Sequence, residues 1–216
     1  MGRSRTRDTD NRVGGGRIGP PRPRLAVCAT ALIATLLTGC VPAKFSGYLP
    51  SGPGTAETGY CIASIKDVLR IPVDSGVTFI IRAGENPRNQ TITLSIVVNV
   101  PQGVTVQLLT PTILLQSEEW PQTRSLHIDR ITGSGPKYGP GFYAPTEKLT
   151  GTADSRPHFV LWFLKGEKGT LFETGIPKVG SFSMQLPPLR INDKIYRVET
   201  VKFVAYSKWS VYLCAQ

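Results

Sequence analysis

Apolar and polar residues alternate with a period of two along much of the chain after residue 76, a pattern typical of β-strands with one buried face. The clearest case is Thr91–Val100, TITLSIVVNV, and the segments 76–82 and 103–109 follow the same rule. The residues Pro101, Gln102 and Gly103 between two of these strands suit a tight turn. The predicted inward residues are Ile92, Leu94, Ile96, Val98 and Val100; then Val77, Phe79 and Ile81; then Val104, Val106 and Leu108.

Further short strands are predicted along the rest of the chain. HFVLWFL is apolar without alternation, which indicates a central strand covered on both faces, and Asn192-Asp193 lies at a predicted hairpin tip. IASIKDVLRI, residues 62–71, fits a short helix nearly as well as a strand. The remaining predicted strands are 112–116, 124–131, 158–164, 181–186, 190–198, 200–206 and 209–215.

Some eight or nine short strands favour an all-β fold, and we predict one antiparallel β-sandwich domain, immunoglobulin-like or of a related Greek-key type. The composition agrees, because 22 glycines and 18 prolines among 216 residues indicate many turns without a collagen-like repeat. A chain of this length buries one sizeable core.

The first forty residues have a different character. A basic arm is followed by an apolar run from Leu25 to Leu37, which is the order of an export signal, and thirteen residues are too few for a membrane-spanning helix. The run ends in LLTGC, which resembles the lipobox of bacterial lipoproteins. The resemblance implies cleavage between Gly39 and Cys40, and diacylglycerol on the Cys40 sulfur as a membrane anchor.

This resemblance sets the expected organisation: a lipoprotein signal peptide at 1–39, a lipidated cysteine with a flexible tether at 40–59, and a β-sandwich domain at 60–216. The tether follows from the Pro, Gly, Ser and Thr content of residues 41–59. Val13 is an alternative start if its codon is GTG. No Asp follows Cys40, which by analogy favours the outer membrane, with the domain facing the periplasm.

Export also predicts different fates for the four cysteines. Cys28 leaves with the signal and Cys40 carries lipid, so Cys61 and Cys214 remain. In an oxidising envelope this pair predicts a disulfide between the first and last elements of the domain. A redox pair or a metal pair is the alternative, but there is no Cys-x-x-Cys, and the chain has only two histidines to add as ligands.

The net charge of +10 is unevenly distributed along the chain. Seven of the 25 basic residues lie before Leu25, and beyond it 18 basic residues are interspersed with 13 acidic ones. This mild excess does not form a basic run, so we expect no nucleic-acid partner.

No common nucleophile, phosphate-loop or zinc-peptidase motif occurs in the sequence, and we expect no catalytic residue, metal or cofactor. His127 and His158 are interpreted as strand histidines, with a general base as the alternative. Glu118 and Glu119 beside Trp120 invite comparison with the carboxylate pair of a glycosidase. Adjacent strand residues face opposite sides, however, so a solvated loop is favoured; Asp129 is a further candidate carboxylate.

The candidate contact surface is Gly133–Pro157, which is too long for an ordinary hairpin loop. It carries Lys137, Tyr138, Phe142 and Tyr143 on a Gly/Pro frame, and these are the candidate ligand-binding residues. Such aromatics stack on sugars, anchor a protein partner, or fold back to cover the sandwich.

Three functional hypotheses follow. The first is a non-enzymatic, membrane-anchored envelope lipoprotein that acts through contacts with an envelope protein or as a structural accessory. The second is a glycan-binding or other ligand-binding module that uses the aromatic loop. The third is a hydrolase with an unrecognised carboxylate site.

Overall fold

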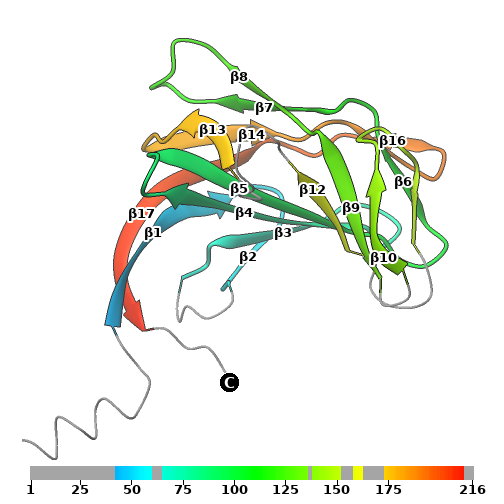
Figure 1. Cartoon of the computed structure of the whole chain (residues 1–216), viewed down its shortest axis with the longest axis horizontal. Helices are drawn as coiled ribbons and strands as arrows, with labels where there is room; N and C mark the ends of the chain where they lie inside the picture. Colours follow the sequence, from blue (N-terminus) through cyan, green and yellow to red (C-terminus); the bar gives the residue numbers. More distant parts are fainter. Residues whose placement is uncertain (1–41, 60–64, 136–137, 152–157, 163–172, 212–216) are drawn as a thin grey trace, which may run out of the picture. The chain divides into compact units, whose positions relative to one another are not determined.

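The computed structural model describes residues 42–59, 65–135, 138–151, 158–162 and 173–211, all of which belong to one compact unit spanning Val41–Gln216. These residues contain β-strands and no helix, so the predicted all-β class is confirmed (Figure 1). The strands are β1 Pro42–Ser51, β2 Thr55–Glu57, β3 Val68–Pro72, β4 Thr78–Asn86, β5 Thr91–Asn99, β6 Thr105–Leu108, β7 Thr112–Gln116, β8 Arg124–His127, β9 Arg130–Gly135, β10 Tyr138–Tyr143, β11 Leu149–Thr150, β12 His158–Trp162, β13 Glu173–Pro177, β14 Ser181–Gln185, β15 Leu189–Ile191, β16 Lys194–Tyr196 and β17 Val201–Val211.

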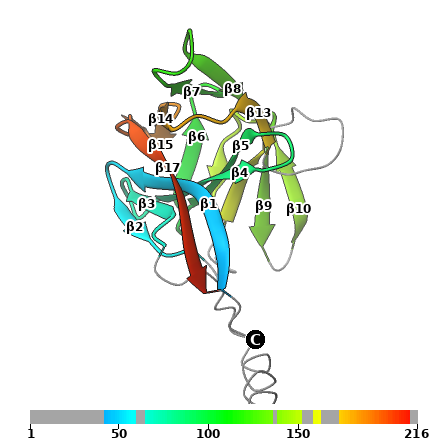
Figure 2. The ribbon, with the colours of Figure 1, turned by 90° about the vertical axis from the view of Figure 1, so that its left-hand side faces the viewer.

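The strands form three antiparallel sheets. A five-stranded sheet has the order β1-β17-β14-β7-β8, and an eight-stranded sheet has the order β10-β9-β12-β5-β4-β3-β2. In the eight-stranded sheet β13 also pairs with β5, so that β12 and β13 occupy successive parts of one β5 edge. A four-stranded sheet, β11-β6-β15-β16, completes the domain. Figure 2 shows the β1–β17 ribbon and the β9–β10 hairpin extending from the body of the fold.

The main core lies between the sheets, and Ile65 and Tyr206 form a second, small buried cluster. The predicted inward face of β5 is buried throughout, as are Phe79 and Ile81 of β4. From the five-stranded sheet, Phe182 stacks on Phe203 with ring centroids 4.9 Å apart, and Tyr48 meets the Phe182 edge at 5.0 Å. The predicted sandwich is therefore confirmed at the level of antiparallel layers around a shared apolar interior.

The structure corrects the prediction of a flexible tether at 40–59. Residues 42–51 are β1 instead, paired in register with β17 from Pro42↔Val211 to Ser51↔Lys202, and residues 55–57 are β2. Composition is misleading here because the hydrogen-bonding partner of β1 lies near the other end of the sequence. The close approach of the Tyr206 ring favours glycine at position 47, because a Cβ there would lie 3.3 Å from the ring.

Several predicted segments divide or merge. The expected strand 124–131 is two strands, β8 and β9, which belong to different sheets, and the chain turns between them where the Ile128 N–H donates to the Pro111 carbonyl at 2.7 Å. The two expected strands at 200–206 and 209–215 are continuous across residues 207 and 208 in β17. The described strands outnumber the eight or nine that were predicted mainly because five of them lie where no strand was predicted: β1, β2, β10, β11 and β13.

Other local predictions are confirmed. The Asn192-Asp193 tip joins β15 to β16, and Asn192 adopts the positive φ of 50° that such a turn needs. Gly103, in the predicted turn, has a φ of 74°. β12 pairs on both edges, as a central strand should. The expected cover on both faces is not complete, because Phe159 and Leu161 are buried while Val160 between them is only half-buried. In the ambiguous segment 62–71, Val68 onward is β3, and residues 62–64 lie outside the described residues.

Two adjacent isoleucines on β4 test the assignment of the core. Ile81 is fully buried, whereas Ile80 is only half-buried on the opposite face. Ile81→Ala should lower the free energy of unfolding by about 2–5 kcal/mol because it leaves a cavity, and Ile80→Ala by about half of that or less. Chemical denaturation of both variants measures the difference. If both variants lost the same free energy of unfolding, the assignment of Ile81 to the core and of Ile80 to the opposite face would be contradicted.

Candidate functional site

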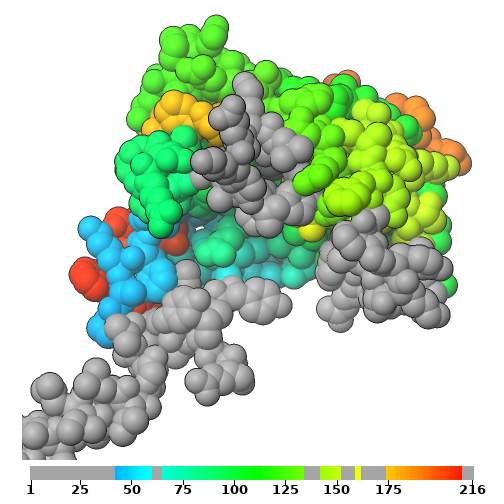
Figure 3. Space-filling view, in the orientation of Figure 1, coloured from blue at the N-terminus to red at the C-terminus, as the bar shows by residue number. Residues whose placement is uncertain are grey.

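The β1–β17 ribbon brings the two ends of the described chain together. We define the ribbon tip as Pro42–Phe45 with its partners Lys208–Val211. Trp209 is 72 % exposed, the largest value among the exposed apolar side chains of the described residues. Lys44, its partner in register, and Lys208 are also exposed. Figure 3 shows the atoms of β1 and β17 gathered at one end of the coloured body of the domain.

The two faces of the ribbon tip each carry one exposed lysine, but their aromatic side chains differ, because Trp209 is exposed and Phe45 packs half-buried against Ile65 and Tyr206. Because residues opposite each other in an antiparallel ladder share a face, Lys44 and Trp209 lie on one face, and Phe45 and Lys208 lie on the other. The sequences of β1 and β17 contain three lysines and no aspartate or glutamate. The ribbon is thus a basic and partly aromatic element with no acidic side chain of its own.

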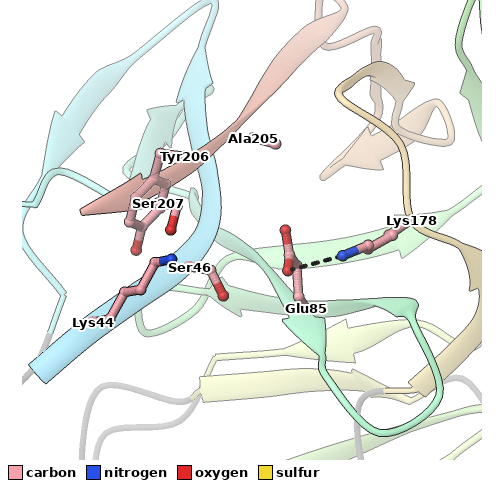
Figure 4. A pocket seen from close by; sticks show the side chains of 7 residues that line it. All are labelled: Lys44, Ser46, Glu85, Lys178, Ala205, Tyr206 and Ser207. Carbon is pink, nitrogen blue, oxygen red and sulfur yellow. Dashed lines mark ion pairs between the residues drawn. The ribbon is translucent and has the colours of Figure 1, made fainter. Parts of the chain in front are cut away.

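Beside the ribbon tip lies a pocket with a volume of about 540 Å³ (Figure 4). Glu85 of β4 and Lys178 lie on one side of the pocket, with the Lys178 Nζ 4.0 Å from the Glu85 Oε2. The ribbon supplies the other side. The lining consists of Lys44, Ser46, Glu85, Lys178, Ala205, Tyr206 and Ser207.

The Tyr206 phenol is held in its neutral form. Its pKa is raised mainly by burial and further by the negative charges of Asp67 and Glu85, while Arg82 acts in the opposite direction. A neutral phenol, one carboxylate and two ammonium groups can hydrogen-bond a polar ligand. They do not form a nucleophile with an adjacent base, so the pocket has no evident catalytic arrangement.

The buried carboxylate of Asp67 lies near the Tyr206 side of the pocket. Asp67 is 2 % exposed, and its Oδ2 lies 2.7 Å from the Arg82 Nη2 and accepts a 2.8 Å hydrogen bond from the Arg82 Nε. Its Oδ1 accepts the Gly59 N–H at 3.0 Å. This ion pair fastens the chain on either side of residues 60–64 to β4, close to the Tyr206 ring.

The predicted aromatic surface is only partly assembled. Phe142 on β10 is 64 % exposed, and the Arg130 guanidinium lies 5.0 Å from its ring centroid. Tyr143 points inward instead and meets Phe159 at 5.8 Å, because neighbours on a strand face opposite sides. The expected long loop instead contains the end of β9, all of β10 and all of β11. The Tyr138 side chain and all of Lys137 lie outside the described residues.

The other sequence candidates are scattered. His127 is exposed on β8, as predicted, and His158 begins β12. Glu118 and Glu119 are exposed in the turn between β7 and β8, and the Glu119 carboxylate accepts the Gly180 N–H at 2.6 Å. Asp129 precedes β9. A solvated turn at Glu118 and Glu119 is thus confirmed, and Glu119 has a structural hydrogen bond.

Gly39, Cys40, Cys61 and Cys214 lie outside the described residues, so cleavage, lipidation and the disulfide remain predictions. Within residues 42–211, apart from the gaps given above, no three His, Cys, Asp or Glu side chains gather as metal ligands. The described chain also contains no helix of sufficient length and apolarity to cross a bilayer.

Comparison with known proteins gives no further guide: no family model matches the chain, nor does any curated protein or solved structure.

The sequence pattern does not predict the ribbon tip. Trp209 lies in a predicted strand, where an apolar residue is normally assigned to the core. The polar pair Ser207-Lys208 just before it was the available signal, because both faces of the strand are polar or charged there. Polar residues on both faces of a strand indicate that neither face packs against the core at that point.

A separate contact joins the β15–β16 hairpin to the turn before β4. The Tyr196 hydroxyl donates a hydrogen bond to the Asp74 carboxylate. This bond lowers the pKa of Asp74 below its ordinary value of 3.8 and raises the pKa of Tyr196 above 10.0. Both shifts favour the pair in which Asp74 is charged and Tyr196 is neutral.

The sign of each shift defines a pH window. The contribution of Asp74 is present above pH 3.8 and is lost as the pH falls through its lowered pKa in the folded state. The contribution of Tyr196 is present below pH 10.0 and is lost as the pH rises through its raised pKa. Tyr196→Phe should therefore lower the melting temperature between these limits and have little effect beyond them. Thermal melts across this range measure it, and a pH-independent difference would count against the contact.

Proposed function

We propose that the chain is a lipid-anchored envelope protein whose β-domain acts through contacts with another envelope protein. The observation that carries this proposal is the position of the first strand. β1 begins at Pro42, two residues after the cysteine of the LLTGC sequence, and its first residue pairs with Val211 at the end of β17. A lipid on Cys40 would thus be attached almost directly to a folded element.

The opposite end of the domain offers a contact surface. Figure 1 shows the β9–β10 hairpin far from the ribbon tip along the long axis of the domain. Phe142 is exposed there, and an exposed aromatic side chain beside an arginine is typical of residues that anchor protein interfaces. An anchor at one end and an aromatic contact at the other suit a domain that displays its far end to a partner.

A protein partner is favoured over a glycan by the environment of Phe142. Glycan recognition by stacking needs an open ring face, and the Arg130 guanidinium lies over one face of this ring. Tyr143, which sequence analysis grouped with it, packs on Phe159.

The intact mass of the protein purified from membranes tests the anchor. We expect a chain that begins at Cys40 and is heavier by diacylglycerol, and two hydrogens lighter if Cys61 and Cys214 are joined. Cys40→Ser should leave the signal uncut and the mass without lipid. An uncleaved, unmodified wild-type chain would overturn the proposed anchor.

Crosslinking in intact cells tests the contact surface. Phe142→Ala should weaken a crosslinked partner complex about tenfold or more, which is the scale of a central interface residue. Ile195→Ala is the matched control, because Ile195 is similarly exposed, at 60 %, but lies on β16. Equal effects of the two substitutions, or loss of binding to purified cell-wall glycan with Phe142→Ala, would reject the protein-contact proposal.

A further inference from the structure

We propose that the ribbon tip docks on an anionic bilayer surface, with Trp209 at the level of the lipid headgroups and Lys44 and Lys208 against lipid phosphates. The proposal deepens the function above and rests on it for its location, because the anchor at Cys40 would bring the tip to the membrane. Docking would fix the orientation of the domain, which a lipid chain alone does not.

The first argument is the exposed indole. Trp209 leaves 72 % of its surface in solvent although it lies within a regular ladder. Tryptophan is favoured at the membrane interface because its ring is apolar and its N–H remains able to bond to water or headgroups. It is the third rung from the end of the ribbon, about 7 Å from the first pair at the usual rise per strand residue.

The second argument is charge. Lys44 and Lys208 are exposed on opposite faces of the tip, and neither β1 nor β17 contains an acidic residue. Basic side chains close to an anionic leaflet are attracted to it within about a Debye length, and long lysine side chains can reach phosphates while their stems lie along apolar groups.

The third argument is reach. Two residues of extended chain span at most about 7 Å, so a lipid-modified Cys40 would hold Pro42 within that distance of the modified cysteine. With the tether replaced by β1, little slack remains between the anchor and the folded ribbon. The side chains of the tip are therefore those that a bilayer would meet first.

The distribution over two faces favours a bilayer over a protein groove. A protein that bound the ribbon would cover one face or pair with one edge, whereas headgroups surround the end of a ribbon on all sides. Each face of the tip carries one exposed lysine, Lys44 beside Trp209 and Lys208 beside Phe45. Phe45 itself is half-buried and packs against Ile65 and Tyr206, so Trp209 is the aromatic residue that the tip offers to the bilayer.

The test uses residues 41–216, the chain without the predicted signal and lipidated cysteine, which contain every described strand and the described core. This fragment should sediment with vesicles of phosphatidylcholine and phosphatidylglycerol more than with phosphatidylcholine alone. Added salt should weaken the binding because the charge contribution is screened. The tryptophan emission should shift to shorter wavelength on binding, and Trp209→Phe should abolish the shift while Trp120 and Trp162 remain.

The variant Lys44→Glu/Lys208→Glu should lower the partition onto the anionic vesicles at least about tenfold. Lys148→Glu/Arg190→Glu is the matched control, because it makes the same change in net charge at exposed basic residues outside the ribbon. All four side chains are exposed, so circular dichroism melts should change little.

The outcomes separate this proposal from the proposed anchor. A fragment that ignores anionic vesicles, or two charge variants that lose binding equally, overturns docking even if the intact mass shows lipid on Cys40. Binding that depends on Trp209 and on the two lysines of the tip supports docking even if the mass shows no lipid. Tip variants that bind vesicles normally but lose a crosslink to a protein would make the tip a protein contact and overturn the proposal.

Discussion

The pairing of β1 with β17 is the constraint on which the rest of the domain depends. Ten register pairs join the strand at residues 42–51 to the strand at residues 201–211, and β17 continues the same sheet into β14 and β7. Tyr48 connects this ladder to the interior. Its hydroxyl donates to the Val179 carbonyl at 2.9 Å and accepts the Val179 N–H at 3.3 Å, so a buried polar group is satisfied by the backbone just before β14.

The β1–β17 ladder is buried in the core at one end and exposed to solvent at the other. Near Phe203 it is part of the aromatic core with Tyr48 and Phe182, and its inner face is closed to solvent. Further along, at Ser207 and Trp209, it has passed beyond the body of the fold, and its side chains are polar, basic or exposed. The same backbone pairing thus provides stability at one end and a projecting surface at the other, without a change in secondary structure.

The sequence predicts features of this fold that depend on neighbours in sequence. The buried face of β5 follows from simple alternation, and the β15–β16 hairpin follows from Asn192 and Asp193. Features that depend on distant partners were not predictable. Pro42–Ser51 is rich in turn-forming and small residues, and only the distant β17 makes it a strand. The break after His127 depends on Ile128 bonding to Pro111 in another segment. At the candidate sites, the sequence left open whether Phe142 and Tyr143 are displayed or fold back. The exposure of Phe142, the inward packing of Tyr143 and the exposure of Trp209 all depend on the positions of the sheets.

The order of the strands also has a consequence for how the chain acquires its structure. β1 is made before every other described strand, whereas its partner β17 is made after all of them. Until β17 is available, one whole edge of the five-stranded sheet has no template, and Tyr48 has nothing to hold it against Val179. Long-range pairings of this kind close slowly because the entropy of a large loop is lost before contacts compensate for it. Completion of the five-stranded sheet is therefore a late event, which leaves the backbone of residues 42–51 without its partner until the last described strand has been made.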